Sequence, residues 1–222
     1  MRPPSAARPI NSARPDLDDA LNTRLSILCA EGWDIWDRFS SDVRQNSFHP
    51  FVAADYDAVL EALLPHRGPG LRFLEWGSAS GVITIMADLL GFEAFGIELD
   101  TDLVRTARAL AIKSGSKARF AAGSFLPSGY SWRPSGGDGR TGTLGHGASG
   151  YLQLEHPLDE FDVIFAFPWP GEEPMMLDLM RCFGRSDARL LLNTVTEGIQ
   201  TYQGGRLIAP PDATESASTT ML

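Results

Sequence analysis

Residues 73–85 read FLEWGSASGVITI, in which an acid and a glycine turn separate two apolar runs. The pattern is typical of a short buried strand that ends in a turn and is followed by an apolar helix. Gly77 permits a sharp turn with positive φ, and Gly81 lets the helix start close to the strand. Glu75 and Ser78 add polar groups at the same joint. The stretch therefore predicts a strand–turn–helix unit whose turn either only packs or holds a ligand.

The rest of the chain alternates between short apolar runs and helix-like periodicity. We predict strands over 94–97, 118–121, 161–167 and 188–193, and helices over 82–90, 100–112 and 174–183. Such alternation predicts an α/β fold with a doubly wound, mostly parallel sheet. Two glycines at 204–205, between β-prone runs, predict a hairpin and hence a short antiparallel C-terminal edge.

The composition changes along the chain and suggests a domain plan. Helical periodicity over 17–66 predicts an N-terminal helical cap, and 67–209 is the predicted sheet domain. A glycine-rich insert at about 131–150 interrupts the domain, and it is expected to be either a lid or disordered. The proline-rich residues 1–16 and the polar residues 210–222 predict a disordered arm and tail.

Charge and hydrophobicity limit the classes of partner. The chain has a net charge of −9, which argues against binding to nucleic acid. No apolar run approaches the ~20 residues of a membrane helix, so we expect no membrane partner. Two distant cysteines in apolar settings fit a reduced, cytoplasmic protein. The histidines and cysteines lack the spacing of metal ligands, and we predict no metal.

The glycine register argues against a dinucleotide ligand. A dinucleotide fingerprint reads G-x-G-x-x-G, but positions 77, 79 and 82 are Gly, Ala and Val. Glu75 would also repel a pyrophosphate. The second predicted strand ends in FGIELD, which places Glu98 seventeen residues past Gly81. An acid there accepts hydrogen bonds from ribose hydroxyls, so the two acids predict a nucleoside ligand without a pyrophosphate.

These motifs resemble those of the class I S-adenosylmethionine-dependent methyltransferases, over about residues 72–193. The family's first motif, [DE]-x-G-x-G-x-G, is matched by Glu75, Gly77 and Gly81, with Ala79 in place of the middle glycine. The resemblance implies that S-adenosylmethionine is the cofactor, that the turn around Ser78 lies against its methionine part, and that Glu98 holds the ribose. We expect Glu75 to organise the turn and the ammonium end of the ligand.

The third motif departs from the family pattern. A Gly-Asp pair is typical after the third strand, but here the residues are Gly123 and Ser124. The resemblance implies that the adenine meets either the Ser124 side chain or the backbone of Phe125.

The acceptor side is predicted after the fourth strand, in FPWPGEE at 167–173. Phe167 and Trp169 are candidate walls of an acceptor pocket. The stretch differs from the [DN]-P-P-[YFW] motif of nucleobase methyltransferases because Phe167 replaces the polar first residue. Glu172 and Glu173 either cap the next helix or supply a general base. His49, within the helical cap, is a third candidate base.

Together these features predict methyl transfer from S-adenosylmethionine to a small-molecule acceptor. The reaction is an in-line displacement in which the protein supplies mainly proximity and orientation. Two alternatives stay open at this point. One is a non-catalytic nucleoside-binding module, and the other is an NAD(P)-dependent oxidoreductase.

Overall fold

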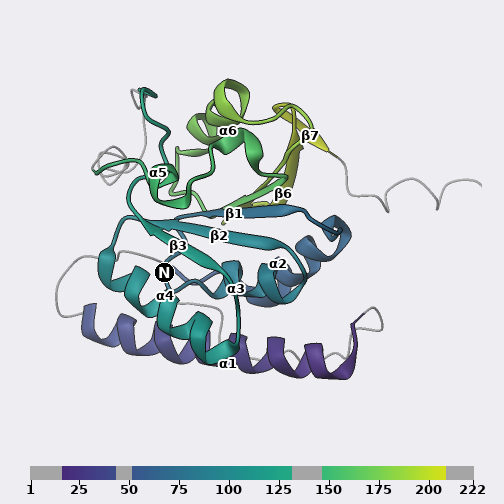
Figure 1. The fold of residues 1–222 in the computed structure, drawn as a ribbon, viewed down its shortest axis with the longest axis vertical. Coiled ribbons are helices and arrows are strands. Elements are labelled where there is room, and N and C mark those ends of the chain that lie inside the picture. Colours follow the sequence, from purple (N-terminus) through teal and green to yellow (C-terminus); the bar gives the residue numbers. More distant parts are fainter. Residues whose placement is uncertain (1–16, 44–51, 132–146, 209–222) are drawn as a thin grey trace, which may run out of the picture.

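A computed structural model describes residues 17–43, 52–131 and 147–208 (Figure 1). It contains a seven-stranded sheet in the order β3-β2-β1-β4-β5-β6-β7. The first five of these strands are parallel, and β6 and β7 are antiparallel. The predicted doubly wound sheet with an antiparallel edge is confirmed. The predicted arm and tail, most of the glycine-rich insert and His49 lie outside the described residues.

The strands and helices have the following bounds. The strands are β1 (Arg72–Trp76), β2 (Glu93–Glu98), β3 (Arg119–Ala122), β4 (Val163–Ala166), β5 (Arg189–Thr194), β6 (Gly198–Gln203) and β7 (Arg206–Ile208). The helices are α1 (Asp19–Val43), α2 (Tyr56–Leu63), η1 (Leu64–His66), α3 (Val82–Leu89), α4 (Thr101–Ser114), α5 (Tyr151–Leu154), η3 (Leu158–Glu160) and α6 (Glu173–Phe183). None of the described helices is long and apolar enough to cross a membrane.

The direction of the chain through the sheet reverses between β1 and β4. From β1 the chain moves outward through β2 to β3, and it then returns to place β4 on the other side of β1. Trp76, the last residue of β1, pairs with Ile97 of β2 and Ala166 of β4. In open parallel sheets, ligands bind outside the carboxyl ends of the strands at such a switch point. The glycine turn follows β1 at this place.

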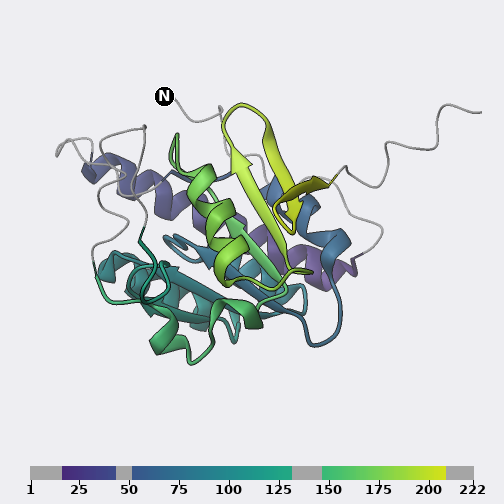
Figure 2. The same cartoon turned by 90° about the horizontal axis from the view of Figure 1, so that it is seen from above.

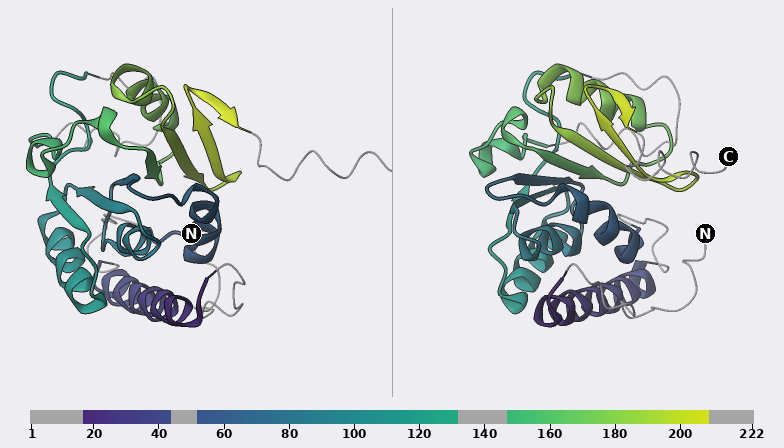
Figure 3. Two further views of the ribbon diagram at one scale, coloured as in Figure 1. Left: turned by 45° about the vertical axis from the view of Figure 1, so that its right-hand side comes forward. Right: turned by 90° about the vertical axis from the view of Figure 1, so that its right-hand side faces the viewer.

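Two apolar layers enclose the sheet. Helices α1 to α4 cover one face, and α5 and α6 cover the other (Figures 1 and 3). Side chains alternate between the layers along each strand, so Phe73 packs with the α1–α4 layer and Leu74 with the α5–α6 layer. Helix α1 is the outermost element of its layer and packs against α3 (Figure 1).

Local sequence signals fix several element ends. Asp100 caps α4, since its side chain accepts hydrogen bonds from the backbone N–H groups of Asp102 and Leu103 at the start of that helix. Gly204 and Gly205 both have positive φ and join β6 to β7 in the predicted hairpin (Figure 2).

Backbone hydrogen bonds join the end of the glycine-rich insert to the residues that follow β3. Residues 147–150 are described, and the backbone N–H of Ser124 donates to the carbonyl of Ala148 at 2.9 Å. The backbone N–H of Gly150 donates in turn to the carbonyl of Ser124 at 2.8 Å. Helix α5 follows directly and was not predicted, because four residues are too few to show helical periodicity.

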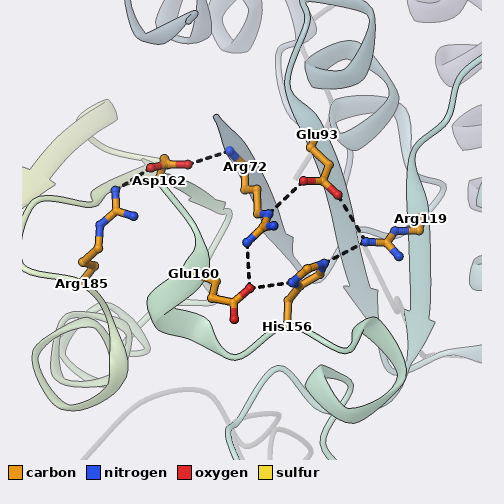
Figure 4. Close-up of polar contacts among 7 residues, drawn as sticks. All are labelled: Arg72, Glu93, Arg119, His156, Glu160, Asp162 and Arg185. Atoms are coloured by element: carbon orange, nitrogen blue, oxygen red, sulfur yellow. Dashed lines mark hydrogen bonds and ion pairs between the residues drawn. The ribbon is translucent and has the colours of Figure 1, made fainter. Parts of the chain in front are cut away.

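Charged side chains form a network at the amino ends of the strands, opposite the glycine turn (Figure 4). Arg72 bonds Glu93 at 2.9 Å and Glu160 at 2.7 Å, and Glu160 also bonds His156 at 2.7 Å. Arg119 bonds the other nitrogen of His156 at 3.0 Å. The bond to His156 is the main reason why the pKa of Glu160 lies below its usual value. The network ties the first residues of β1, β2 and β3 together.

Candidate functional site

The turn after β1 uses its two glycines for different purposes. Gly77 and Gly81 have φ values of +72° and +79°. A Cβ at Gly77 would meet nothing within 4 Å, whereas a Cβ at Gly81 would lie 2.7 Å from both Ala107 and Phe120. Gly81 thus permits close packing of the α3 start on α4 and β3. Gly77 leaves open space in front of the backbone, which a ligand can approach.

Ala79 occupies the middle of the turn with a φ of +44°. Alanine rarely adopts this left-handed conformation because its Cβ crowds the backbone. The family motif has glycine here, which avoids that strain. The surrounding structure must therefore hold Ala79 in this conformation, and a hydrogen bond from its backbone N–H to Glu98 contributes to this.

Glu98 makes that contact from the carboxyl end of β2. Its Oε2 accepts from the backbone N–H of Ala79 and its Oε1 from that of Asp100, both at 2.9 Å. Burial raises the pKa of Glu98, and the backbone hydrogen bonds oppose that shift. Each carboxylate oxygen can accept a second hydrogen bond. Glu98 therefore links the turn to α4 and keeps acceptor capacity for a hydroxyl group.

Glu75 has a structural role under the turn. Gly81, at the N-cap of α3, has no side chain to cap the helix. Glu75 takes over this role, since its Oε2 accepts from the backbone N–H of Thr84 at 2.9 Å and from Thr84 Oγ1 at 2.5 Å. These contacts tie Glu75 to the first turn of α3, and its predicted role in organising the turn for a ligand stays a prediction.

The carboxyl of Glu75 is poorly suited to an ammonium group. Burial raises its pKa to about 8, although the bonds from Thr84 lower it and the charge of Glu98 raises it. The group is therefore mostly neutral at pH 7. The predicted contact between Glu75 and the ammonium end of a ligand gains no support from this arrangement.

The raised pKa of Glu75 predicts that stability depends on pH. The folded state keeps the proton up to about pH 8, whereas an unfolded chain releases it near pH 4.5. This group's stabilisation is therefore present below pH 4.5 and is lost as the pH rises toward 8. We expect Glu75→Gln to flatten the fall in unfolding free energy between pH 5 and 8 by more than ~1 kcal/mol. Urea denaturation at several pH values measures this, and a profile identical to the wild type would contradict it.

The carboxyl end of β3 provides a third part of the site. Ser124 is buried, and its Oγ accepts from the backbone N–H of Leu126 at 3.1 Å. Phe125 stacks on Trp76 with ring centroids 5.5 Å apart. Leu99, at the tip of β2, is 40% exposed, which is unusual for an apolar residue beside a buried strand. The predicted adenine contacts of Ser124 and Phe125 stay predictions. A Cβ at Gly147 would lie 3.2 Å from Leu99 and 4.0 Å from the backbone nitrogen of Ser124, so Leu99 adds an apolar surface near Ser124.

A buried hydrogen bond fastens α5 to the site. The indole Nε1–H of Trp76 donates to the Tyr151 hydroxyl at 2.8 Å, and both residues are buried. Gln153, two residues further along α5, bonds both the N–H and the carbonyl of Ala122. Trp76 immediately precedes Gly77, so the end of the insert and the glycine turn are held in one arrangement.

The stretch after β4 lies beside the glycine turn, as the pairing of β1 with β4 requires. Phe167 is half-buried against the α1–α4 layer, and Trp169 is also half-buried. Glu172 is buried and accepts from the backbone N–H of Trp169 at 3.0 Å, while Glu173 accepts from that of Gly171 at 3.1 Å. Both carboxylates thus stabilise the turn before α6. Their role as a general base stays a prediction, as do the acceptor walls Phe167 and Trp169.

The site also contains a buried hydroxyl with no hydrogen bond. Ser78 is 2% exposed, and its Oγ has no hydrogen-bond partner among the described residues. Its side chain lies over the backbone of Gly96, where a Cβ would come within 2.7 Å of Ser78 Oγ. A buried polar group without a partner is uncommon and is often satisfied by a ligand. Within the described residues, no group of three His, Cys, Asp or Glu side chains is placed to hold a metal ion.

Comparison with known proteins supports the family predicted from the motifs. No family model matches the chain. A ribosomal protein L11 methyltransferase from Thermus thermophilus is 40% identical over 115 residues, which are 50% of this chain and 44% of that protein. Over this stretch the chain is similar to an enzyme that is named a methyltransferase, as the motifs predict. It spans less than half the length of this curated relative.

Solved methyltransferases match the chain at low identity. A precorrin-6y C5,15-methyltransferase from Geobacter metallireducens is 17% identical with a TM-score of 0.45, and the match covers 66% of this chain and 65% of that one. An RNA methyltransferase from Salinibacter ruber, in complex with S-adenosyl-L-homocysteine, is 16% identical with a TM-score of 0.45, covering 65% and 78%.

The curated relative corrects the predicted partner of the chain. We predicted a small-molecule acceptor and no nucleic acid, and this prediction is wrong. The curated relative is named for a ribosomal protein and not for a small molecule. The prediction used the net charge of −9, which averages over the whole surface. Such an average does not describe the face that meets an acceptor.

Proposed function

We propose that the chain binds S-adenosylmethionine at the β1–β4 switch point and transfers its methyl group to a protein. The observation that supports cofactor binding most directly is the Glu98 carboxylate, which is tied to the backbone of Ala79 and Asp100 with acceptor capacity to spare. Ribose hydroxyls are donors of the right kind for it. The open space at Gly77 suits the methionine part.

A protein acceptor is favoured by one observation. The curated relative methylates ribosomal protein L11 according to its name.

The chemistry needs little from the protein beyond positioning. The cofactor, when bound, supplies an activated methyl group on a sulfonium. The residues of this chain would orient it through Glu98 and the glycine turn, and Phe167 and Trp169 would exclude water from the acceptor side. The lone pair of the acceptor forms the new bond to carbon as the carbon–sulfur bond breaks. The electron pair of that bond stays on sulfur, and the acceptor then loses its proton.

Calorimetric titration tests the cofactor. We expect S-adenosylmethionine and S-adenosylhomocysteine to bind and NAD not to bind. Two glycines provide a matched pair of variants, since Gly70 and Gly77 have φ values of +71° and +72° and neither has an atom within 4 Å of a Cβ. Gly77→Ala should weaken S-adenosylhomocysteine at least about tenfold, whereas Gly70→Ala should not. Equal affinities would place the ligand elsewhere.

A labelled methyl group tests the acceptor. The full chain is incubated with methyl-tritiated S-adenosylmethionine and either purified ribosomal protein L11 or ribosomal RNA. Label in the protein supports the proposal, and label in RNA alone contradicts it. Cofactor binding without label in either acceptor would favour the non-catalytic nucleoside-binding alternative.

A further inference from the structure

Helix α1 packs close to the glycine turn. Gly32 of α1 packs so tightly that a Cβ there would lie 2.7 Å from Val82, the first residue of α3. One turn further along α1, Trp36 forms a small buried cluster with Leu103 of α4. Ala79, the middle residue of the glycine turn, packs against this cluster. The second half of α1 therefore borders the site.

Trp36 carries a buried donor that the described residues do not use. The residue is only 9% exposed, and its indole Nε1 has no hydrogen-bond partner among them. An indole nitrogen can only donate. Buried tryptophans usually pair this N–H, as Trp76 does with Tyr151. A donor left unpaired next to a candidate site calls for an acceptor that arrives with the ligand.

The neighbours of Trp36 indicate which part of a ligand this would be. The backbone N–H of Ala79 is already bonded to Glu98, the candidate ribose ligand. The two acids of the site, Glu98 and the largely neutral Glu75, offer no positive charge, so neither can attract an anionic group of the ligand. The resemblance in the first motif places the turn itself against the methionine part, whose carboxylate needs donors.

We propose that Trp36 binds the cofactor by donating its indole N–H to the carboxylate of the methionine part. This inference rests on the proposed binding of S-adenosylmethionine and extends it to a residue of the N-terminal helix. A second buried group without a partner, the Ser78 hydroxyl, lies one residue from Ala79 and supports a polar ligand at this turn.

Trp36→Phe removes the N–H and keeps an aromatic ring in the cluster. Calorimetry should show an affinity for S-adenosylhomocysteine that is about 10- to 100-fold lower, as expected for a hydrogen bond to a charged group. Methylthioadenosine, which lacks the carboxylate, should bind the variant and the wild type equally. Trp33→Phe is the matched control on the same helix, because Trp33 packs on Tyr56, and it should leave both affinities unchanged.

The outcomes separate the two proposals. If the wild type binds no S-adenosylhomocysteine, the proposed function fails. If the wild type binds it and Trp36→Phe binds equally well, only the role of Trp36 fails. An equal loss for methylthioadenosine would also overturn the assignment to the carboxylate.

A measurement on the wild type keeps the inference testable if the variant does not fold. In ¹⁵N-labelled protein, the indole N–H signal of Trp36 can be assigned through its proximity to Leu103. Addition of S-adenosylhomocysteine should shift this signal and slow its exchange with solvent, whereas methylthioadenosine should do neither. A signal that does not respond to S-adenosylhomocysteine in a protein that binds it would overturn the inference.

Discussion

Gly81→Ala is expected to lower the free energy of unfolding by about 3 kcal/mol. Two costs add up at this position. The residue has a φ of +79°, and a Cβ in that conformation costs roughly 1–2 kcal/mol. The new methyl group would also lie 2.7 Å from Ala107 and from the Phe120 ring. These neighbours are buried and packed, and overpacking of this kind costs about 1–3 kcal/mol. Urea denaturation monitored by circular dichroism measures the sum.

Gly70→Ala isolates the first of these costs. Its φ is +71°, and no atom lies within 4 Å of a Cβ there. We expect a loss of about 1 kcal/mol, which is the backbone strain alone. A Gly81→Ala variant no less stable than Gly70→Ala would show that α3 can move away from α4 and β3 at little cost. The glycine turn would then be less tightly packed than the short distances at Gly81 indicate.

The sheet could be predicted from the sequence because its strands carry a strong signal. Residues 163–166 are buried without exception, as expected of a central parallel strand. The predicted and observed strands differ only at their ends, by one or two residues. Helix α5 could not be predicted because its four residues are held by hydrogen bonds to distant parts of the chain. Tyr151 bonds Trp76, and Gln153 bonds Ala122.

The sequence predicts which residues lie at the site, but not which groups their side chains contact. Glu75 and Glu98 both lie near the carboxyl ends of neighbouring strands, and from the sequence alone either could bind a ligand. The structure separates them, because Glu75 is bonded to Thr84 and Glu98 to the backbone of the turn. Thr84 was not predicted, since no spacing rule relates it to Glu75. The unpaired donor of Trp36 could not be seen either, because a tryptophan at helical spacing is typical of a core.

The acceptor was the weakest prediction, for a physical reason. Methyl transfer from a sulfonium needs positioning more than dedicated catalytic groups. An acceptor therefore leaves few chemical marks in a sequence, and its recognition depends on surface shape. The stretch after β4 shows this, since Glu172 and Glu173 are occupied with the turn before α6.

Glu98→Gln is expected to weaken S-adenosylhomocysteine about 100-fold. The carboxylate is the proposed acceptor for the ribose hydroxyls, and hydrogen bonds to a charged group contribute about 1.5–3 kcal/mol each. Glutamine has almost the same shape, but its amide nitrogen cannot accept from the backbone N–H of Ala79 or Asp100. One of these two backbone hydrogen bonds is then lost. The variant therefore weakens the hold on the backbone around the turn as well as the contact to the ribose. Calorimetric titration of the full chain measures the change.

Glu93→Gln is the matched control for this variant, because Glu93 begins the same strand that Glu98 ends. Its carboxylate is exposed and pairs with Arg72 and Arg119 at the amino ends of the strands (Figure 4). Exposed ion pairs contribute about 0–1 kcal/mol to stability, and this one is remote from the glycine turn. We therefore expect Glu93→Gln to bind S-adenosylhomocysteine like the wild type. If Glu98→Gln also binds it with unchanged affinity, Glu98 only supports the turn, and the ribose must find its acceptor in another residue at the carboxyl ends of the strands.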